Sequence, residues 1–184
     1  MKGDASLFAA IDLGSNAFRL MIGQSVTRNQ QLMIQEVKTL REPVRLAEGF
    51  QGGALDELAL DRGWQALARF GKKLRGFEAG RVRAVATSAV RQADNAPLFL
   101  ASAERHLGFR IDVISGHEEA QLVYAGVAHT LPDTQRMRLV VDIGGGSTEL
   151  ILGQGAQPLL TEGVAVRSGT VGARSFPGDA NRTR

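Results

Sequence analysis

Apolar positions recur with two different spacings along this chain of 184 residues. Short apolar or alternating runs predict strands, whereas apolar positions that recur every three or four residues predict helices. The clearest predicted helix covers residues 55–75, where Leu60, Leu67 and Leu74 belong to one apolar stripe and a basic cluster lies on the solvated face. Asn95 is predicted to cap the N-terminus of a second helix. The predicted strands are two within 7–23, then 31–40, 82–87, 110–114, one starting at 137 and 157–166, and the predicted helices are 55–75, 96–107 and 118–129. Three strands, then alternating helices and strands, then a restart of strands indicate an α/β fold.

One segment occurs twice. IDLGSNAFRLMIG at residues 11–23 and VDIGGGSTELILG at residues 141–153 start 130 residues apart, and Asp12 aligns with Asp142. Each copy is predicted to form an apolar strand, a tight Gly-rich turn and a second apolar strand. Such turns present backbone N–H groups to an anion and let phosphate oxygens approach closely. The repeat therefore predicts two related lobes with a phosphate held between their turns.

The second hairpin carries two acidic side chains. If the chain reverses between Gly145 and Gly146, Asp142 lies directly opposite Glu149, with Cβ atoms roughly 5 Å apart. Facing carboxylates repel unless a cation lies between them, and oxygen ligands with a few waters suit Mg²⁺. The same construction in the first copy pairs Asp12 with an arginine. The alternative is that Glu149 points to solvent and Asp142 caps its own turn, because a shift of one residue in register reverses every side chain.

A predicted helix starts in SGHEEAQLVYAGV, at residues 115–127. Ser115 and Glu118 form a capping box, in which the serine oxygen accepts from the backbone N–H of Glu118 and the carboxylate of Glu118 reaches back to Ser115. Glu119 shares a face with the apolar Leu122, so partial burial would raise its pKa toward that of a general base. The alternative is a first-turn acid that only stabilises the helix dipole.

Arg91 lies in ATSAVRQADN, in the connection between the strand at 82–87 and the next helix. Its guanidinium is suited to bind phosphate oxygens. The alternative is an ordinary surface arginine.

Composition narrows the classes of function. The chain is 43% hydrophobic and 22% charged, with a net charge of +3, which fits a folded protein with an anionic ligand. Scattered basic residues, one Tyr and one Trp argue against nucleic-acid binding, including duplex binding. The absence of cysteine excludes a disulfide framework and favours a reducing compartment, the cytoplasm. The first residues predict a strand and not a signal peptide, and no apolar run is long enough to predict a membrane span.

Several motifs together resemble the exopolyphosphatase and guanosine pentaphosphate phosphatase family (Ppx/GppA). They occur in the family's order and spacing up to about residue 161, and they are DLGSN, VRLAEG, VRAVATSAVRQADN, ISGHEEAQLVYAGV and VVDIGGGSTEL. The resemblance implies an actin-like, ribonuclease-H-related fold of two lobes with the active site between them. It also implies Mg²⁺-dependent release of terminal orthophosphate from inorganic polyphosphate, or of the 5′-terminal phosphate from guanosine pentaphosphate.

The resemblance also assigns roles to particular residues. Glu119 would be the general base for the attacking water, Arg91 would neutralise charge on the transferred phosphoryl group, and Asp142 and Glu149 would hold the metal. The phosphate-binding residues would be Gly14, Ser15 and Asn16 from one lobe and Gly144, Gly145, Gly146 and Ser147 from the other. The motifs and side-chain chemistry described above select the same residues without the resemblance.

The predicted first lobe covers residues 1–131, and residues 132–184 would begin a second lobe. Family members continue further, so we expect a C-terminally truncated second lobe with an exposed apolar sheet face, and weak or absent activity for this chain. Pairing of family members would involve regions absent here, which leaves a homodimer of the full-length protein open. Two other functions are open: a non-catalytic phosphate- or nucleotide-binding module, and an actin-like kinase that transfers phosphate from ATP.

Overall fold

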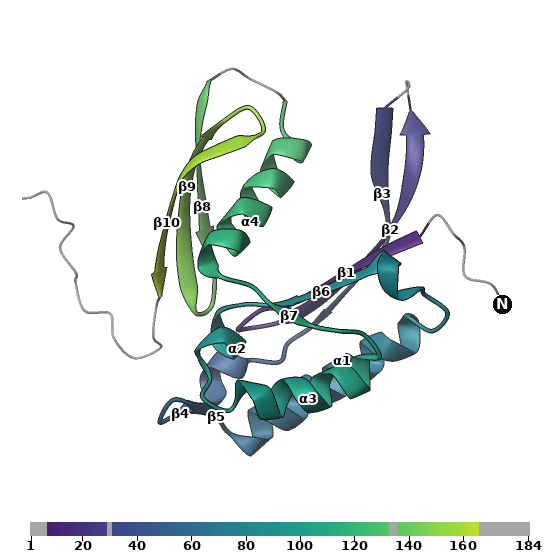
Figure 1. Ribbon diagram of the computed structural model, residues 1–184, viewed down its shortest axis with the longest axis vertical. Helices are drawn as coiled ribbons and strands as arrows, with labels where there is room; N and C mark the ends of the chain where they lie inside the picture. Colours follow the sequence, from purple (N-terminus) through teal and green to yellow (C-terminus); the bar gives the residue numbers. More distant parts are fainter. Residues whose placement is uncertain (1–6, 29–30, 133–135, 166–184) are drawn as a thin grey trace, which may run out of the picture.

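The computed structural model describes residues 7–28, 31–132 and 136–165, and in that part of the chain the strands form two larger sheets (Figure 1). The first sheet has the order β3-β2-β1-β6-β7; β1, β2 and β3 are antiparallel, while β6 and β7 run parallel to β1. The second is antiparallel, in the order β10-β9-β8. The strands are β1 Leu7–Leu13, β2 Phe18–Arg28, β3 Gln31–Glu42, β4 Phe50–Gln51, β5 Ala54–Leu55, β6 Val82–Ala86, β7 Asp112–Val113, β8 Met137–Ile143, β9 Ser147–Gln154 and β10 Gln157–Ala165.

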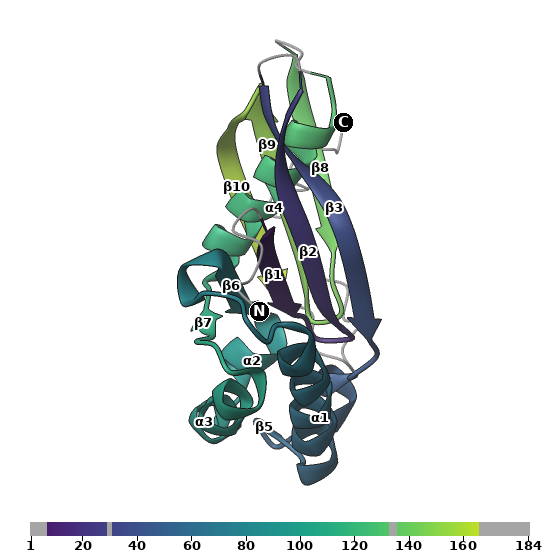
Figure 2. The ribbon, with the colours of Figure 1, turned by 90° about the vertical axis from the view of Figure 1, so that its right-hand side faces the viewer.

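Helices α1 and α3 cover one face of the first sheet. The described helices are α1 Glu57–Lys73, α2 Ser88–Gln92, α3 Ala96–Leu107 and α4 Gly116–Thr130, with short 3-10 turns η1 Leu46–Gly49 and η2 Ala79–Arg81. In both ribbon views α1 and α3 lie together on the same side of this sheet (Figures 1 and 2). Alternate residues of β1, such as Ile11 and Leu13, point into the core beneath these helices and are fully buried. Among the described helices, none has the length and apolar character needed to cross a membrane.

Helix α4 packs on the second sheet. Ala120 and Tyr124 form a separate apolar cluster with Val140 and Ile151, and the Tyr124 hydroxyl donates to the carbonyl of Gly155 at 3.2 Å. Figure 1 shows α4 lying along β8, β9 and β10. The division at residue 131 stays a prediction, but the packing groups α4 with the strands that follow it.

The opposite face of the second sheet is apolar and open to solvent. Leu139, Val141 and Ile143 alternate along β8 and are 63%, 49% and 78% exposed. Leu160 of β10, paired with Leu152, is also exposed. An uncovered apolar face is what the sequence predicted for these strands.

One local prediction in this region was wrong. Asn95 stands at the N-cap of α3 but forms no side-chain cap; instead its amide exchanges two hydrogen bonds with the backbone of Leu55, at 3.0 and 2.8 Å. That long-range pairing satisfies both polar groups of the amide, which a cap would not. Arg91 lies in the predicted connection between β6 and α3, where the chain forms the short helix α2.

Candidate phosphate-binding and hydrolytic site

The two Gly-rich turns of the repeated segment meet at the junction between the two sheets. A Cβ on Gly145 would lie 2.5 Å from the side chain of Asn16, and one on Gly146 would lie 2.7 Å from Oγ of Ser15 and 2.8 Å from Oγ of Ser88. Only glycine lets the turns approach this closely, since real Cβ contacts are essentially never under 3.0 Å. The first turn is held from behind by a hydrogen bond from the Ala47 N–H to the carbonyl of Ser15.

A polar cavity of about 330 Å³ opens between these turns. All seven residues predicted to bind phosphate line it, together with Glu119 and Asp142, although their roles stay predictions. The lining residues are Asp12, Gly14, Ser15, Asn16, Ala17, Arg19, Arg41, Thr87, Ser88, Glu119, Asp142, Gly144, Gly145, Gly146 and Ser147.

The predicted register of both hairpins is confirmed: Asp142 faces Glu149, and Asp12 faces Arg19. Glu149 is 1% exposed, so the alternative in which it points to solvent is wrong. Its Oε2 atom is buried and has no hydrogen-bond partner among the described residues. A buried carboxylate oxygen without a partner is costly, and such an atom needs a reason to be retained.

Glu119 lies near these acidic groups from the first turn of α4. Burial raises the pKa of Glu119 above its ordinary value, and the nearby Glu149 and Asp12 raise it further, while the hydrogen bond from Arg91 opposes them. Burial also raises the pKa of Asp12. The charge of Arg19 lowers this pKa, and the charge of Asp142 raises it. Asp12, Glu119 and Asp142 therefore line one cavity from three separate segments, while the buried Glu149 is not in its lining but interacts electrostatically with Glu119.

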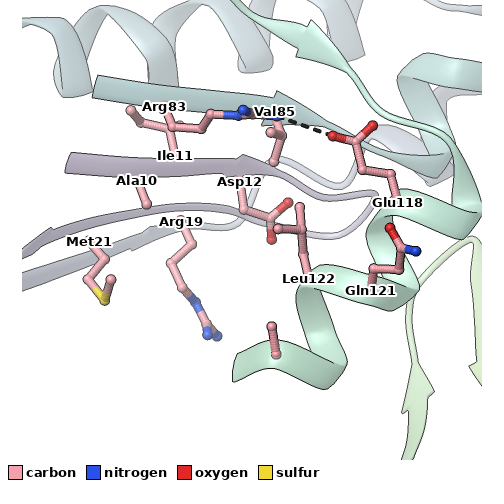
Figure 3. Close-up of a pocket in the computed structure, with 11 residues that line it drawn as sticks. Ala10, Ile11, Asp12, Arg19, Met21, Arg83, Val85, Glu118, Gln121 and Leu122 are labelled. Atoms are coloured by element: carbon pink, nitrogen blue, oxygen red, sulfur yellow. Dashed lines mark hydrogen bonds and ion pairs between the residues drawn. The ribbon is translucent and has the colours of Figure 1, made fainter. Parts of the chain in front are cut away.

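The start of α4 departs in part from the predicted capping box. Ser115 Oγ accepts from the Glu118 N–H at 3.1 Å, as predicted. The carboxylate of Glu118 does not reach back to Ser115; it accepts from Arg83 Nη2 at 3.2 Å, because a charged donor on β6 is within reach (Figure 3). Figure 3 also shows Asp12 and Arg19 on the face of β1 and β2 that is turned toward α4.

Two arginines of the cavity were not assigned to phosphate binding from the sequence. Arg19 was interpreted only as the partner of Asp12, and Arg41 was not singled out. Arg19 and Arg41 are direct neighbours across β2 and β3, and both line the cavity. Among the described residues neither forms an ion pair. The signal in the sequence was that Arg19 and Arg41 fall on the same face of the strands as Asp12. This signal could be used only once the pairing of β2 with β3 was known.

The class of protein is thus an α/β fold with two larger sheets, whose Gly-rich turns meet at a cavity lined by carboxylates. The model of the Ppx/GppA phosphatase family matches residues 25–182, and the chain belongs to this family. An exopolyphosphatase from Cytophaga hutchinsonii is similar, with 29% identity and a TM-score of 0.78 over 87% of this chain and 50% of that one. A Ppx/GppA family member from Aquifex aeolicus has 32% identity and a TM-score of 0.71 over 86% of this chain and 51% of that one.

These matches confirm the predicted family, and the structure confirms the predicted α/β fold class. The chain spans about half the length of these solved relatives.

Proposed function

We propose that the protein hydrolyses phosphoanhydrides and releases terminal orthophosphate from inorganic polyphosphate. Guanosine pentaphosphate is the second proposed substrate, losing its 5′-terminal phosphate. The observation that carries the proposal is that both Gly-rich turns, Glu119 and two arginines without a salt bridge among the described residues line one cavity. Membership of the Ppx/GppA phosphatase family supports it.

The two turns would bind the terminal phosphate through backbone N–H groups, which can approach because the turns lack side chains. Arg19 and Arg41 would bind the phosphates that follow. Two guanidiniums directly opposite each other across a ladder repel, so an anion between them removes that repulsion. Such positioning and charge neutralisation account for most of the catalysis of phosphoryl transfer.

Glu119 would act as the general base. Its carboxylate accepts a proton from a water molecule while the water oxygen bonds to the terminal phosphorus and the bridging P–O bond breaks. The electron pair of that bond leaves with the shortened polyphosphate, so the products are orthophosphate and a chain one phosphate shorter. A raised pKa suits this role, because a base is most effective when its pKa lies near the working pH.

Asp142 and Glu149 are the residues that would hold a magnesium ion. Oε2 of Glu149 is buried with no hydrogen-bond partner in the part of the chain that the structure describes, and together with the facing carboxylate of Asp142 it fits a hard cation. No group of three or more His, Cys, Asp or Glu side chains within the described ranges could hold an ion, so waters and substrate oxygens would complete the coordination. When bound, the ion would neutralise charge on the phosphates.

The test is orthophosphate release by the protein as its gene encodes it, with Mg²⁺ and either polyphosphate of defined length or guanosine pentaphosphate. Glu119→Gln should lower kcat by about 10²- to 10⁴-fold. Glu162→Gln, at an exposed position of β10, is the matched control and should leave kcat unchanged. Binding of polyphosphate without any phosphate release would instead show a non-catalytic module, and ATP turnover that requires a small acceptor would show a kinase.

A further inference from the structure

Arg91 is not among the residues that line the cavity proposed to bind the substrate, whereas Glu119 is. One nitrogen of its guanidinium, Nη1, donates both to the carbonyl of Ile114, at 2.7 Å, and to Oε2 of Glu119, at 3.2 Å. Nη2 lies close to the first residue of α4, where a Cβ on Gly116 would be 3.7 Å from it. The guanidinium therefore contacts the β7–α4 connection and Glu119 together.

The contact with Glu119 is sheltered. The side chains of Arg91 and Glu119 are 27% and 15% exposed, and charge-assisted hydrogen bonds are strongest where water is partly excluded. Glu119 is close to Glu149 and Asp12, whose charges repel its own. A lone carboxylate in that field would turn away from the other acids, and the bond to Arg91 opposes this movement.

We propose that Arg91 is a positioning residue, which holds the carboxylate of Glu119 toward the cavity and does not itself bind the transferred phosphate. This differs from the role of phosphate ligand that the family resemblance implied for Arg91. The inference rests on the proposed function for the role of Glu119. Its consequence is that the effect of Arg91 on the rate passes through Glu119 and leaves the affinity for substrate nearly unchanged.

A double-mutant cycle tests this dependence through orthophosphate release. Arg91→Gln should lower kcat by about 10- to 100-fold, since a hydrogen bond to a charged group is lost, with KM changed by less than about threefold. Arg91→Lys, which keeps the charge and a donor, should recover part of kcat. In the Glu119→Gln background, removal of Arg91 should change kcat by less than about threefold, because coupled residues are not additive. An undiminished loss in that background would overturn the proposal.

Polyphosphate binding provides a readout that does not need activity. Equilibrium binding of polyphosphate of defined length is measured with the Glu119→Gln protein in EDTA. Adding Arg91→Gln should change Kd by less than about threefold, whereas adding Arg41→Gln, an arginine that lines the cavity, should weaken binding by about tenfold or more. Equal weakening by both would show that Arg91 is a phosphate ligand.

The two arms separate failure of this inference from failure of the proposed function. Wild-type protein that binds polyphosphate without releasing phosphate refutes the hydrolase, and the binding comparison still decides whether Arg91 is a ligand. Thermal melts of each variant check that it folds. If Arg91→Gln does not fold, Arg91→Lys takes its place in both arms, with a smaller loss of kcat and the same unchanged Kd expected.

Discussion

Replacement of Glu149 by glutamine should stabilise the metal-free protein. The carboxylate is 1% exposed, its Oε2 has no partner among the described residues, and Glu119 lies within electrostatic range. An unsatisfied buried polar atom costs about 1–3 kcal/mol, and more when it is charged. Glutamine removes the charge at nearly the same volume but keeps a polar group to be satisfied, so we expect a net gain of about 1–2 kcal/mol in the free energy of unfolding.

The melting temperature measures this gain by calorimetry at pH 8. For a chain of 184 residues, a gain of that size corresponds to a rise of about 2–8 °C in EDTA. Added Mg²⁺ should reverse the order: at about 100 times Kd a bound ligand adds about 2.7 kcal/mol to the wild type, and Glu149→Gln should lose most of that increment.

The exposed Glu162 provides the control, because Glu162→Gln should change neither the stability in EDTA nor the response to Mg²⁺. A Glu149→Gln protein that melts below the wild type in EDTA, or that responds to Mg²⁺ as strongly as the wild type, would refute the reasoning that this buried oxygen awaits a cation.

Three further outcomes follow from the site. The rate of phosphate release should rise with pH through the raised pKa of Glu119, because only its ionised form accepts a proton; a profile with its inflection at an ordinary carboxylate pKa would contradict this. Asp12 and Glu119 bind protons more tightly in the folded protein than in the unfolded chain. In EDTA, the free energy of unfolding should therefore fall as the pH rises from the ordinary pKa values of these groups to the raised ones, and then level off. Urea titrations at a series of pH values measure this trend. Gly145→Ala should weaken polyphosphate binding by tenfold or more, since its Cβ would overlap Asn16, whereas Gly163→Ala, with no atom within 4 Å of its Cβ, should bind as the wild type does.

The repeated segment made much of the site predictable. A strand, a short Gly-rich turn and a returning strand are set by neighbouring residues, because turn chemistry and alternation act over a few positions. The pairs Asp142 with Glu149 and Asp12 with Arg19 follow from that local geometry, and both are present. The helix predicted at 96–107 also has those bounds in the structure.

Contacts between segments far apart in the sequence were harder to predict. Arg41 reaches the cavity only through the long β2–β3 ladder, whose register shifts between Ile22 and Gly23, so counting along the strands would misplace its partner. Glu118 bonds Arg83 of β6, 35 residues away, in preference to the backbone of Ser115. In both cases a partner brought near by the fold replaced the one that sequence proximity suggested.

By itself, the sequence determined the family, the two phosphate-type turns and the acidic residues beside them, because these depend on local motifs and short-range geometry. Only the tertiary structure decided that the two turns touch, that Oε2 of Glu149 is buried without a hydrogen-bond partner among the described residues, and that Arg91 donates a hydrogen bond to Glu119. These depend on how two sheets and α4 pack against one another, and packing is set by contacts among residues far apart in the chain.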